Sequence, residues 1–271
     1  MRAPNLDGLG IGKHRLPCPA CDKGPRDTAM AVELRADGSA VWWCWRCHSS
    51  GGLRADKRPR LKHDGNKLDR PTVDIAAAIW KQTAPIAGTE GERYLRLREC
   101  ALPPAIGDLR FHPALYCPEV SAELPALVAK VTTVIGNKAV GIHRIWIRPG
   151  EAKAVKKMRL GGSVEAVCVR LWPDEDVTYS LGIAEGVETA LALARTMEPM
   201  WSCVDAGQMH RFPLLPGLES LVIFADRDRP GLTAAAAVHD RYTADGRDAR
   251  FIYPRLADED FNDVVMRQMR A

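Results

Sequence analysis

The stretch Leu181–Gly231 decides the fold of the C-terminal third, because it contains Ile183-Ala184-Glu185-Gly186 and then Ile223-Phe224-Ala225-Asp226-Arg227-Asp228-Arg229-Pro230-Gly231. Each acidic cluster follows an apolar run typical of a β-strand and precedes a segment typical of a helix. The carboxyl ends of neighbouring parallel strands meet at one edge of an α/β sheet, where such sheets build their sites. We therefore expect Glu185, Asp226 and Asp228 to lie together. Three carboxylates there suit Mg²⁺ or Mn²⁺, ions that commonly handle phosphates.

The rest of this third alternates in the same way between apolar runs and segments with apolar residues at helical spacing. The expected strands are 179–184, 200–204, 221–225 and 249–253, and the expected helices are 186–196, 231–242 and 261–269. Strands that alternate with helices predict a parallel sheet with right-handed crossovers.

Two cysteine pairs predict a second metal site near the N-terminus. Cys18 and Cys21 form one C-x₂-C pair, and Cys44 and Cys47 form the other. Each pair presents two thiolates from a tight knuckle, and two knuckles complete a tetrahedron of sulfur around zinc. The other four cysteines are scattered, which argues against a disulfide framework. The expected ribbon strands are 28–34 and 40–43, joined by a turn at 36–39.

Other side chains of this module leave alternatives open. His14 and His48 flank the knuckles, and we expect both to be exposed and not ligands, because four cysteines already complete the site. Strand alternation places Trp42 and Trp43 on opposite faces. One of them packs on the ribbon and the other stacks on a base of single-stranded DNA, or both belong to the ribbon core.

The two motif sets together resemble a known family. Glu185-Gly186 and Asp226-Arg227-Asp228 are similar to the marks of the Toprim domain of topoisomerases and bacterial-type primases. With the cysteine pairs and the following Gly51-Gly52, the chain resembles the small Toprim DNA primases of phages and plasmids. The resemblance implies an α/β fold with an N-terminal zinc ribbon, a mixed α+β middle subdomain and a C-terminal Toprim domain with a Rossmann-like parallel sheet. The expected domains are a zinc ribbon at 1–52, a flexible basic linker at 53–72, the α+β primase-core subdomain at 73–177 and the catalytic Toprim domain at 178–271.

The middle region shows both helical and strand periodicity. Its Leu109–Pro113 and Gly141–Arg144 motifs resemble the subdomain that precedes Toprim in phage primases. The expected helices are 73–83 and 91–98, and the expected strands are 109–113, 126–135, 140–147 and 166–171.

A basic segment at 156–162 is the best functional candidate of this region. Clustered cations followed by Gly-Gly approach phosphates closely, and by resemblance such a segment holds nucleic acid and nucleotide beside the metals. An ordinary basic hairpin end is the equal alternative. The candidate nucleic-acid or nucleotide-binding residues are Arg144, Lys156, Lys157, Arg159, Arg227 and Trp43, with His143 and Arg148 as further members.

The acidic set departs from the family at one position. Replicative primases place another Asp four residues after the first Glu, and here Thr189 stands there, preceded by Glu188. Further acidic candidates are Glu188, Asp258, Asp260 and Asp263. The alternative for the segment 260–263 is a helix N-cap with favourable dipole charges.

The composition and charge of the chain limit its possible partners and location. The formal net charge of +4 over 271 residues is mild, but basic residues clearly outnumber acidic ones before Pro71, which suits an N-terminal module that touches phosphates. No apolar run approaches a membrane span, and the N-terminus lacks the apolar core of a signal peptide, so we expect a cytoplasmic protein without a membrane partner. No G-x-x-x-x-G-K-[ST] motif occurs, so any replicative helicase partner is expected to act in trans.

The resemblance implies a nucleotidyltransferase. The expected activity is DNA-directed synthesis of short RNA primers on single-stranded DNA from NTPs, with structural Zn²⁺ and catalytic Mg²⁺ or Mn²⁺ held by Glu185, Asp226 and Asp228. The alternatives are a metal-dependent Toprim nuclease and a non-catalytic DNA-binding replication accessory protein.

Overall fold

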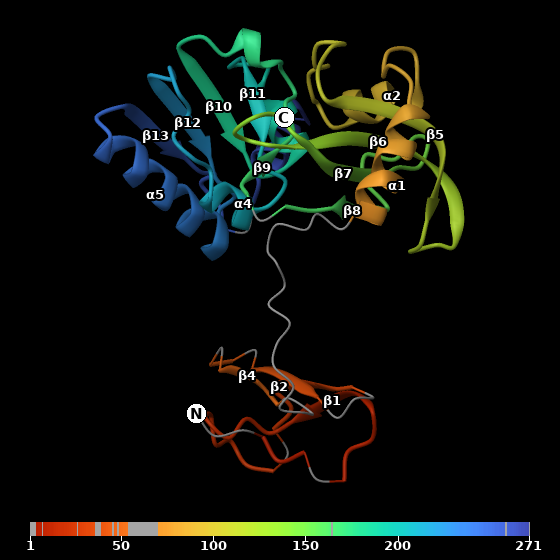
Figure 1. The fold of residues 1–271 in the computed structure, drawn as a ribbon, viewed down its shortest axis with the longest axis vertical. Coiled ribbons are helices and arrows are strands. Elements are labelled where there is room, and N and C mark those ends of the chain that lie inside the picture. Colours follow the sequence, from red (N-terminus) through yellow and green to blue (C-terminus); the bar gives the residue numbers. More distant parts are fainter. Residues whose placement is uncertain are drawn as a thin grey trace. The chain divides into compact units, whose positions relative to one another are not determined.

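The chain forms two compact units, Met1–Asp64 and Gly65–Ala271, which are described separately (Figure 1). The structure is a computed structural model. It describes residues 4–6, 8–25, 27–35, 39–44, 46–47, 49–53, 70–163, 165–257 and 259–270.

The N-terminal unit is built on a four-stranded antiparallel sheet in the order β1-β2-β3-β4. Its strands are β1 (Gly12–Leu16), β2 (Met30–Leu34), β3 (Ala40–Cys44) and β4 (Ser50–Leu53). The central hairpin agrees with the sequence, whereas β1 and β4 were not expected. Leu53 pairs with Ala40 as the end of β4, so the linker expected at 53–72 loses its first residue. It loses its last three to the helix that begins at Arg70, where Pro71 suits a first turn, and its remaining residues lie outside the described ranges.

An antiparallel sheet opens the second unit, with strand order β5-β6-β7-β8 and β9 paired to β6. Helices α1 (Arg70–Lys81) and α2 (Glu90–Leu97) precede it. Its strands are β5 (Leu109–Cys117), β6 (Ala122–Thr133), β7 (Ala139–Trp146), β8 (Lys156–Gly161) and β9 (Val167–Cys168), and a 3₁₀ turn follows at Asp174–Asp176.

Side chains of this sheet alternate between two cores. Ala126, Val128 and Trp146 pack with the residues of α1 on one face. Leu127 and Ile145 point to the other face, where they join α2 and residues of the C-terminal third in a single larger core. This period of two decides where the charged residues of β7 and β8 point.

The C-terminal third contains the expected parallel sheet, in the order β11-β10-β12-β13. Its strands are β10 (Ser180–Ala184), β11 (Met200–Ser202), β12 (Ser220–Phe224) and β13 (Asp248–Ile252), and its helices are α3 (Val187–Leu193), α4 (Ala206–His210), α5 (Arg229–Ala244) and α6 (Phe261–Arg270). Leu181 and Ile223 pack with α4 and α5 on one face. Ala184 and Phe224 pack with α3 and α6 on the other. The α/β class and the C-terminal parallel sheet predicted from the sequence are therefore confirmed.

Two expected elements are shorter than predicted. The strand expected at 166–171 survives only as β9, because the side chain of Arg170 turns into the interior, where its guanidinium donates to the carbonyl oxygens of Thr133 and Val134. Val169 instead forms an antiparallel bridge with Ser202, which joins the two sheets. The helix expected at 186–196 ends at Leu193. None of the helices in the described ranges is long and apolar enough to span a bilayer.

Candidate functional site

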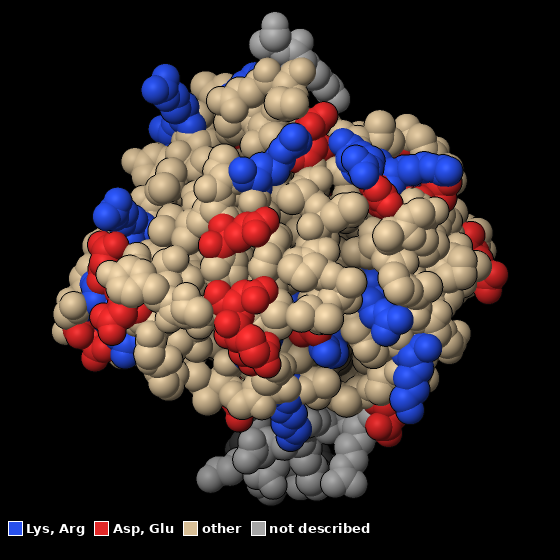
Figure 2. Space-filling view, turned by 90° about the horizontal axis from the view of Figure 1, so that it is seen from above, with Lys and Arg blue, Asp and Glu red and all other residues tan. Residues whose placement is uncertain are grey.

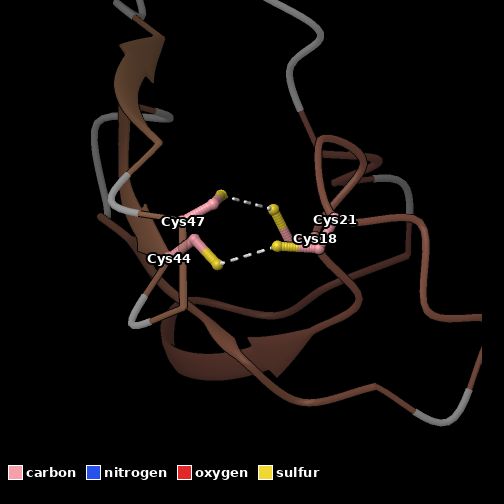
Figure 3. Close-up of side chains that lie close together, drawn as sticks. All are labelled: Cys18, Cys21, Cys44 and Cys47. Atoms are coloured by element: carbon pink, nitrogen blue, oxygen red, sulfur yellow. Dashed lines mark hydrogen bonds between the residues drawn. The ribbon is translucent and has the colours of Figure 1, made fainter.

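The four paired cysteines meet in one cluster, as the sequence predicted (Figure 3). The sulfur of Cys18 lies 3.6 Å from that of Cys47, and the sulfur of Cys21 lies 3.7 Å from that of Cys44. These distances are far longer than a disulfide bond of about 2.05 Å. They match the edge of a tetrahedron with metal–sulfur bonds of about 2.3 Å, which is about 3.8 Å. The cluster therefore fits a tetrahedral thiolate-bound metal ion and an N-terminal zinc ribbon.

The ionisation of the four thiols in the cluster depends on a bound cation. Backbone N–H groups of Cys47 and Arg46 point at the sulfur of Cys44 and lower its pKa to about 6. Hydrogen bonding to Cys47 and the other neighbouring thiols raises the pKa of Cys21 to about 12. The four sulfurs thus cannot all carry negative charge unless a positive ion lies between them.

The second knuckle is fastened to the segment before β2 by an ion pair. Both guanidinium nitrogens of Arg46 donate to Asp27, each over 3.0 Å, and this holds the pKa of Asp27 below its ordinary value. Nε2 of His14 donates to the carbonyl oxygen of Gly10 over 2.6 Å, so His14 is not part of the cluster. His48 lies outside the described residues.

The two described tryptophans of β3 follow the expected alternation. Trp42 packs against the small core of the unit, and a Cβ added at Gly51 would lie 2.6 Å from its ring. Trp43 lies on the other side and is 40% exposed. Of the two, Trp43 therefore offers the ring that a base can reach.

A second set of residues gathers at the carboxyl edge of the parallel sheet. Strands β10 and β12 are direct neighbours, and their last residues, Ala184 and Phe224, are paired in register. Glu185 follows the first strand directly, and Asp226 and Asp228 follow the second. The sheet therefore brings together the three carboxylates that the sequence singled out.

Asp226 is the most strongly perturbed member. Burial, followed by the negative charges of Glu185, Asp260 and Asp228, raises its pKa to about 7. Its Oδ1 is buried and has no hydrogen-bond partner among the described residues. A buried carboxylate oxygen without a donor is costly, and a bound cation removes that cost.

Glu185 responds to the same surroundings. Burial raises its pKa, and the charge of Asp228 adds to this shift, while the backbone N–H of Ala206 opposes it. We name Glu185, Asp226, Asp228 and Asp260 the carboxylate cluster, because each affects the ionisation of another member.

The turn after β12 depends on a glycine. Asp228 is the N-cap of α5, and its Oδ1 accepts a hydrogen bond from the backbone of Gly231 over 2.7 Å. A Cβ at Gly231 would lie 2.6 Å from the carbonyl oxygen of Asp226. Only glycine therefore lets α5 begin this close to the carboxylates.

The three acidic candidates near the C-terminus do not all join the carboxylate cluster. Asp260 accepts a hydrogen bond from the backbone of Asp263 at the start of α6, and burial raises its pKa. It is thus both a helix cap and a member of the carboxylate cluster. Asp263 is exposed in the first turn of α6, and Asp258 lies outside the described residues.

Glu188 has other partners. It is buried, and its Oε1 accepts a hydrogen bond from Tyr94 over 3.0 Å and lies 2.8 Å from Nζ of Lys157. Thr189, at the position where the family has an Asp, is buried in α3. Neither residue adds a free carboxylate to the cluster.

The carboxylate cluster is open, not a closed cage. Within the described ranges, the four cysteines form the only group of three or more potential metal ligands whose donor atoms all lie within 4.8 Å of one another. Mg²⁺ typically keeps several waters and takes only one or two protein carboxylates together with substrate phosphates. The spacing and the partnerless oxygen of Asp226 fit such a site.

Strand alternation splits the expected basic set. Lys157 pairs in register with Ile145, and Arg159 with His143, so both lie on the face that meets the C-terminal third. Arg159 lies 3.8 Å from Asp205. Their neighbour across the strand, His143, is held neutral, because burial lowers its pKa to about 4.

The other basic candidates point elsewhere. Lys156 pairs in register with Trp146 on the α1 face and forms an ion pair with Glu119, and Arg144 stacks 4.8 Å from the ring of Trp146. Arg227 donates to the carbonyl oxygen of Pro254 and lies over the ring of Tyr253. These three are not brought to the carboxylate cluster. Arg148 is exposed and lies 3.9 Å from Glu151.

Three residues near the cluster were missed in the sequence. Asp205 caps α4 just after β11, so an acidic residue behind a third parallel strand was the available signal. Tyr94 and Arg98 come from α2 and its C-cap, more than eighty residues before Glu185 along the chain. The sequence predicts a helix at 91–98, but it does not indicate that these two side chains reach the site.

Charge on the molecular surface is mixed. The face drawn in Figure 2 has acidic side chains near its centre and most of its Lys and Arg side chains towards its periphery. This face therefore has no continuous basic stripe of the kind that tracks a nucleic-acid backbone.

Comparisons with known proteins agree with the parallel sheet. Residues 180–271 match the family described as Toprim domain, and residues 70–171 match a domain of unknown function (DUF7146). A search of curated proteins finds no match.

A search of solved structures finds DNA primase chains that resemble this chain over part of their length. A DNA primase domain from Pseudomonas aeruginosa gives a TM-score of 0.45 at 13% identity, over 73% of this chain and 75% of that one. The RNA polymerase domain of Mycobacterium tuberculosis primase DnaG, in complex with double-stranded DNA, gives a TM-score of 0.41 at 14% identity, over 73% and 78% of the two chains.

Proposed function

We propose that this Toprim-containing chain is a DNA primase that makes short RNA primers on single-stranded DNA from nucleoside triphosphates. The support is the combination of a Toprim match over 180–271, an open carboxylate cluster at its sheet edge and a four-cysteine cluster in the N-terminal unit. The proposed domains are the ribbon at 1–52, the linker near 53–72, the middle subdomain at 73–177 and the catalytic domain at 178–271.

The environment of Asp226 carries the proposal. Its buried Oδ1 has no donor among the residues that the structure describes, and burial and neighbouring negative charges raise its pKa to about 7. A cation bound at this edge of the parallel sheet would stabilise the charged carboxylate. Glu185, Asp226 and Asp228 would hold one or two Mg²⁺ or Mn²⁺ ions. When bound, these ions neutralise triphosphate charge and help the primer 3′-hydroxyl to lose its proton.

The chain's own cations complete this site. Lys157 and Arg159 lie on the sheet face that meets the C-terminal third. This position supports the proposal that they bind phosphate oxygens of the nucleotide or of the primer strand. His143, which is neutral, adds no charge there. Arg227 is proposed to stabilise the loop after β12 and not to bind nucleotide, since its guanidinium already contacts Pro254 and Tyr253.

The ribbon is proposed to bind structural Zn²⁺ through its four cysteines and to hold the template strand. Its exposed Trp43 supplies a stacking surface for an unpaired base. A replicative helicase acting in trans and an origin in a phage or another mobile element are parts of the same proposal.

Primer synthesis tests the proposal directly. Purified protein is incubated with mixed-sequence single-stranded DNA, four NTPs and Mg²⁺ or Mn²⁺, and the products are separated on a denaturing gel. Short RNA products are expected from the wild type and not from Asp226→Asn. As the control for folding, the melting temperature of Asp226→Asn without metal should be no lower than that of the wild type. A degraded template would instead establish a nuclease, and an intact template without product would favour an accessory DNA-binding protein.

A further inference from the structure

Two adjacent lysines of β8 have carboxylate partners on opposite faces of the sheet. Nζ of Lys156 lies 2.9 Å from Oε2 of Glu119, and Nζ of Lys157 lies 2.8 Å from Oε1 of Glu188. The side chain of Glu119 is 52% exposed, whereas that of Glu188 is 3% exposed. The two pairs have the same chemistry and length, but only the second is built into the interior.

Glu188 is a fixed and charged group. It lies in the first turn of α3, and Tyr94 of α2 donates its hydroxyl to the same Oε1 that faces Lys157. Burial alone would raise the pKa of Glu188. The charge and hydrogen bond of Lys157, together with a backbone hydrogen bond and the charge of Arg98, outweigh burial and hold the pKa below its ordinary value. The other titratable groups that interact electrostatically with the carboxylate of Glu188 are Arg98, Cys100 and His143.

The ammonium of Lys157 also acts on the carboxylate cluster. Its positive charge lowers the pKa values of Asp226 and Asp260 against the effect of burial. The lysine side chain remains 44% exposed, and an ammonium has three N–H donors, so Lys157 can donate to a ligand as well as to Glu188. Lysine has a flexible four-carbon stem, and a partner that fixes this stem in advance reduces the entropy lost when a phosphate binds.

We propose that Glu188 and Tyr94 are positioning residues for Lys157, and that the ammonium they hold receives a phosphate of the incoming nucleotide beside the carboxylate cluster. This inference rests on the proposed function. Under this proposal Glu188 is not a further metal ligand. Its Oε1 already contacts the hydroxyl of Tyr94 and the ammonium of Lys157.

The test compares the two matched pairs. Glu188→Gln and Tyr94→Phe are measured beside Glu119→Gln, which removes the equivalent carboxylate on the other face. Isothermal titration with ATP and Mn²⁺ gives the nucleotide affinity, and the NTP dependence of primer synthesis gives KM and kcat. We expect Glu188→Gln to weaken ATP binding and raise KM about tenfold, because it removes the charge partner of Lys157. We expect Tyr94→Phe to do so about threefold, because it removes one hydrogen bond to that partner and keeps its charge. The kcat should be nearly unchanged in both variants. Glu119→Gln is expected to stay within about twofold of the wild type.

A Lys157→Met background separates positioning from a purely structural role. If Glu188 acts through the lysine, Glu188→Gln adds no further loss of ATP affinity in that background. Equal effects of Glu188→Gln with and without Lys157, or equal effects of Glu188→Gln and Glu119→Gln, would overturn the proposal. If Glu188→Gln does not fold, as judged by its melting curve, Tyr94→Phe decides, because it removes one hydroxyl and keeps the charges.

The binding measurement also keeps this inference apart from the proposed function. A wild type that binds ATP with Mn²⁺ but makes no primer overturns the primase proposal, while the variant affinities still decide the positioning role. A wild type that makes primers with unchanged KM in Glu188→Gln overturns the positioning role alone. A wild type that binds no ATP overturns both.

Discussion

Asp228 accepts a hydrogen bond from the backbone N–H of Gly231 over 2.7 Å, so one candidate metal ligand is also the N-cap of helix α5. The carboxylate of Asp228 thus stabilises the start of α5 through its Oδ1. The side chain nevertheless remains exposed, so a ligand can reach it. Changes at Asp228 must therefore be designed so that the loss of the cap is not mistaken for the loss of a metal ligand.

Asp228→Asn and Asp228→Ala are expected to differ in stability but not in activity. Asn is as good an N-cap as Asp, whereas Ala costs about 1 kcal/mol of folding free energy. Both remove a negative charge from the carboxylate cluster, so neither should support primer synthesis. Urea unfolding and the primer gel measure the two effects separately. Equal unfolding midpoints for the two variants would show that the cap contributes nothing.

Gly231→Ala should be much more harmful than Gly186→Ser, although both glycines follow the strands that carry the carboxylates. A Cβ at Gly231 would lie 2.6 Å from the backbone oxygen of Asp226, whereas at Gly186 the nearest atom, Oγ1 of Thr189, is 3.4 Å away. We expect a loss of about 1–3 kcal/mol for the first, as for overpacking, and a loss below about 0.5 kcal/mol for the second. Thermal unfolding of both variants checks this order, and similar melting temperatures would contradict it.

The stability of the metal-free protein should fall as the pH rises from about 4 to about 7. In the folded state the pKa of Asp226 is raised to about 7, mainly by burial, so over this range the folded state binds more protons than the unfolded state. Glu185 and Asp260 are raised in the same direction. Melting temperatures at pH 5 and pH 8 without added divalent metal should show the fall, and Asp226→Asn should reduce it.

Added Mg²⁺ supplies the control for this pH effect. The ion binds the charged carboxylate and should therefore raise the melting temperature at pH 8 more than at pH 5. The effect of Mg²⁺ on the melting temperature is compared between pH 5 and pH 8 in both proteins. If this effect changes with pH equally in Asp226→Asn and in the wild type, groups other than Asp226 cause the pH dependence.

The fold was largely predictable where the apolar residues followed a single helical or strand period. The pairing of Ala184 with Phe224, which sets Glu185 beside Asp226, follows from two buried strands of a parallel sheet. The Cys₄ cluster followed from spacing alone, since a knuckle is a local structure. The strand expected at 166–171 was too long, because the sequence does not reveal that Arg170 finds buried carbonyl acceptors.

The surroundings of the site were less predictable. Lys156 and Lys157 form one basic run in the sequence, yet strand alternation sends them to different faces, and this became evident only when β8 proved to be a strand. The contact of Tyr94 with Glu188 joins residues that are 94 positions apart. Tertiary packing of this kind leaves no local signal.

Removing the metal proposed for the cysteine cluster should unfold the ribbon. Among the described residues, its core cluster has four buried members, Cys18, Met30, Val32 and Cys44, of which two are candidate ligands. A core this small cannot hold the sheet once the ligands are separated. A chelator, or Cys44→Ser, is expected to abolish the bound zinc measured by native mass spectrometry and to open residues 12–53 to protease. A ribbon that resists protease in Cys44→Ser would show that the sheet is stable without the metal.

Trp43→Ala should weaken binding of single-stranded DNA, while Trp43→Phe should retain most of it. Trp43 is 40% exposed on β3, whereas Trp42 packs against the ribbon core under Gly51. Stacking on an aromatic ring contributes about 1–3 kcal/mol per base, so we expect the Ala variant to bind about tenfold more weakly or worse. Fluorescence anisotropy with a labelled oligonucleotide measures the affinity at fixed salt. Since stacking does not depend on charge, the Ala variant should keep the salt dependence of the wild type. A change in that salt dependence, or an unchanged affinity, would mean that the strand contacts the ribbon through cations instead.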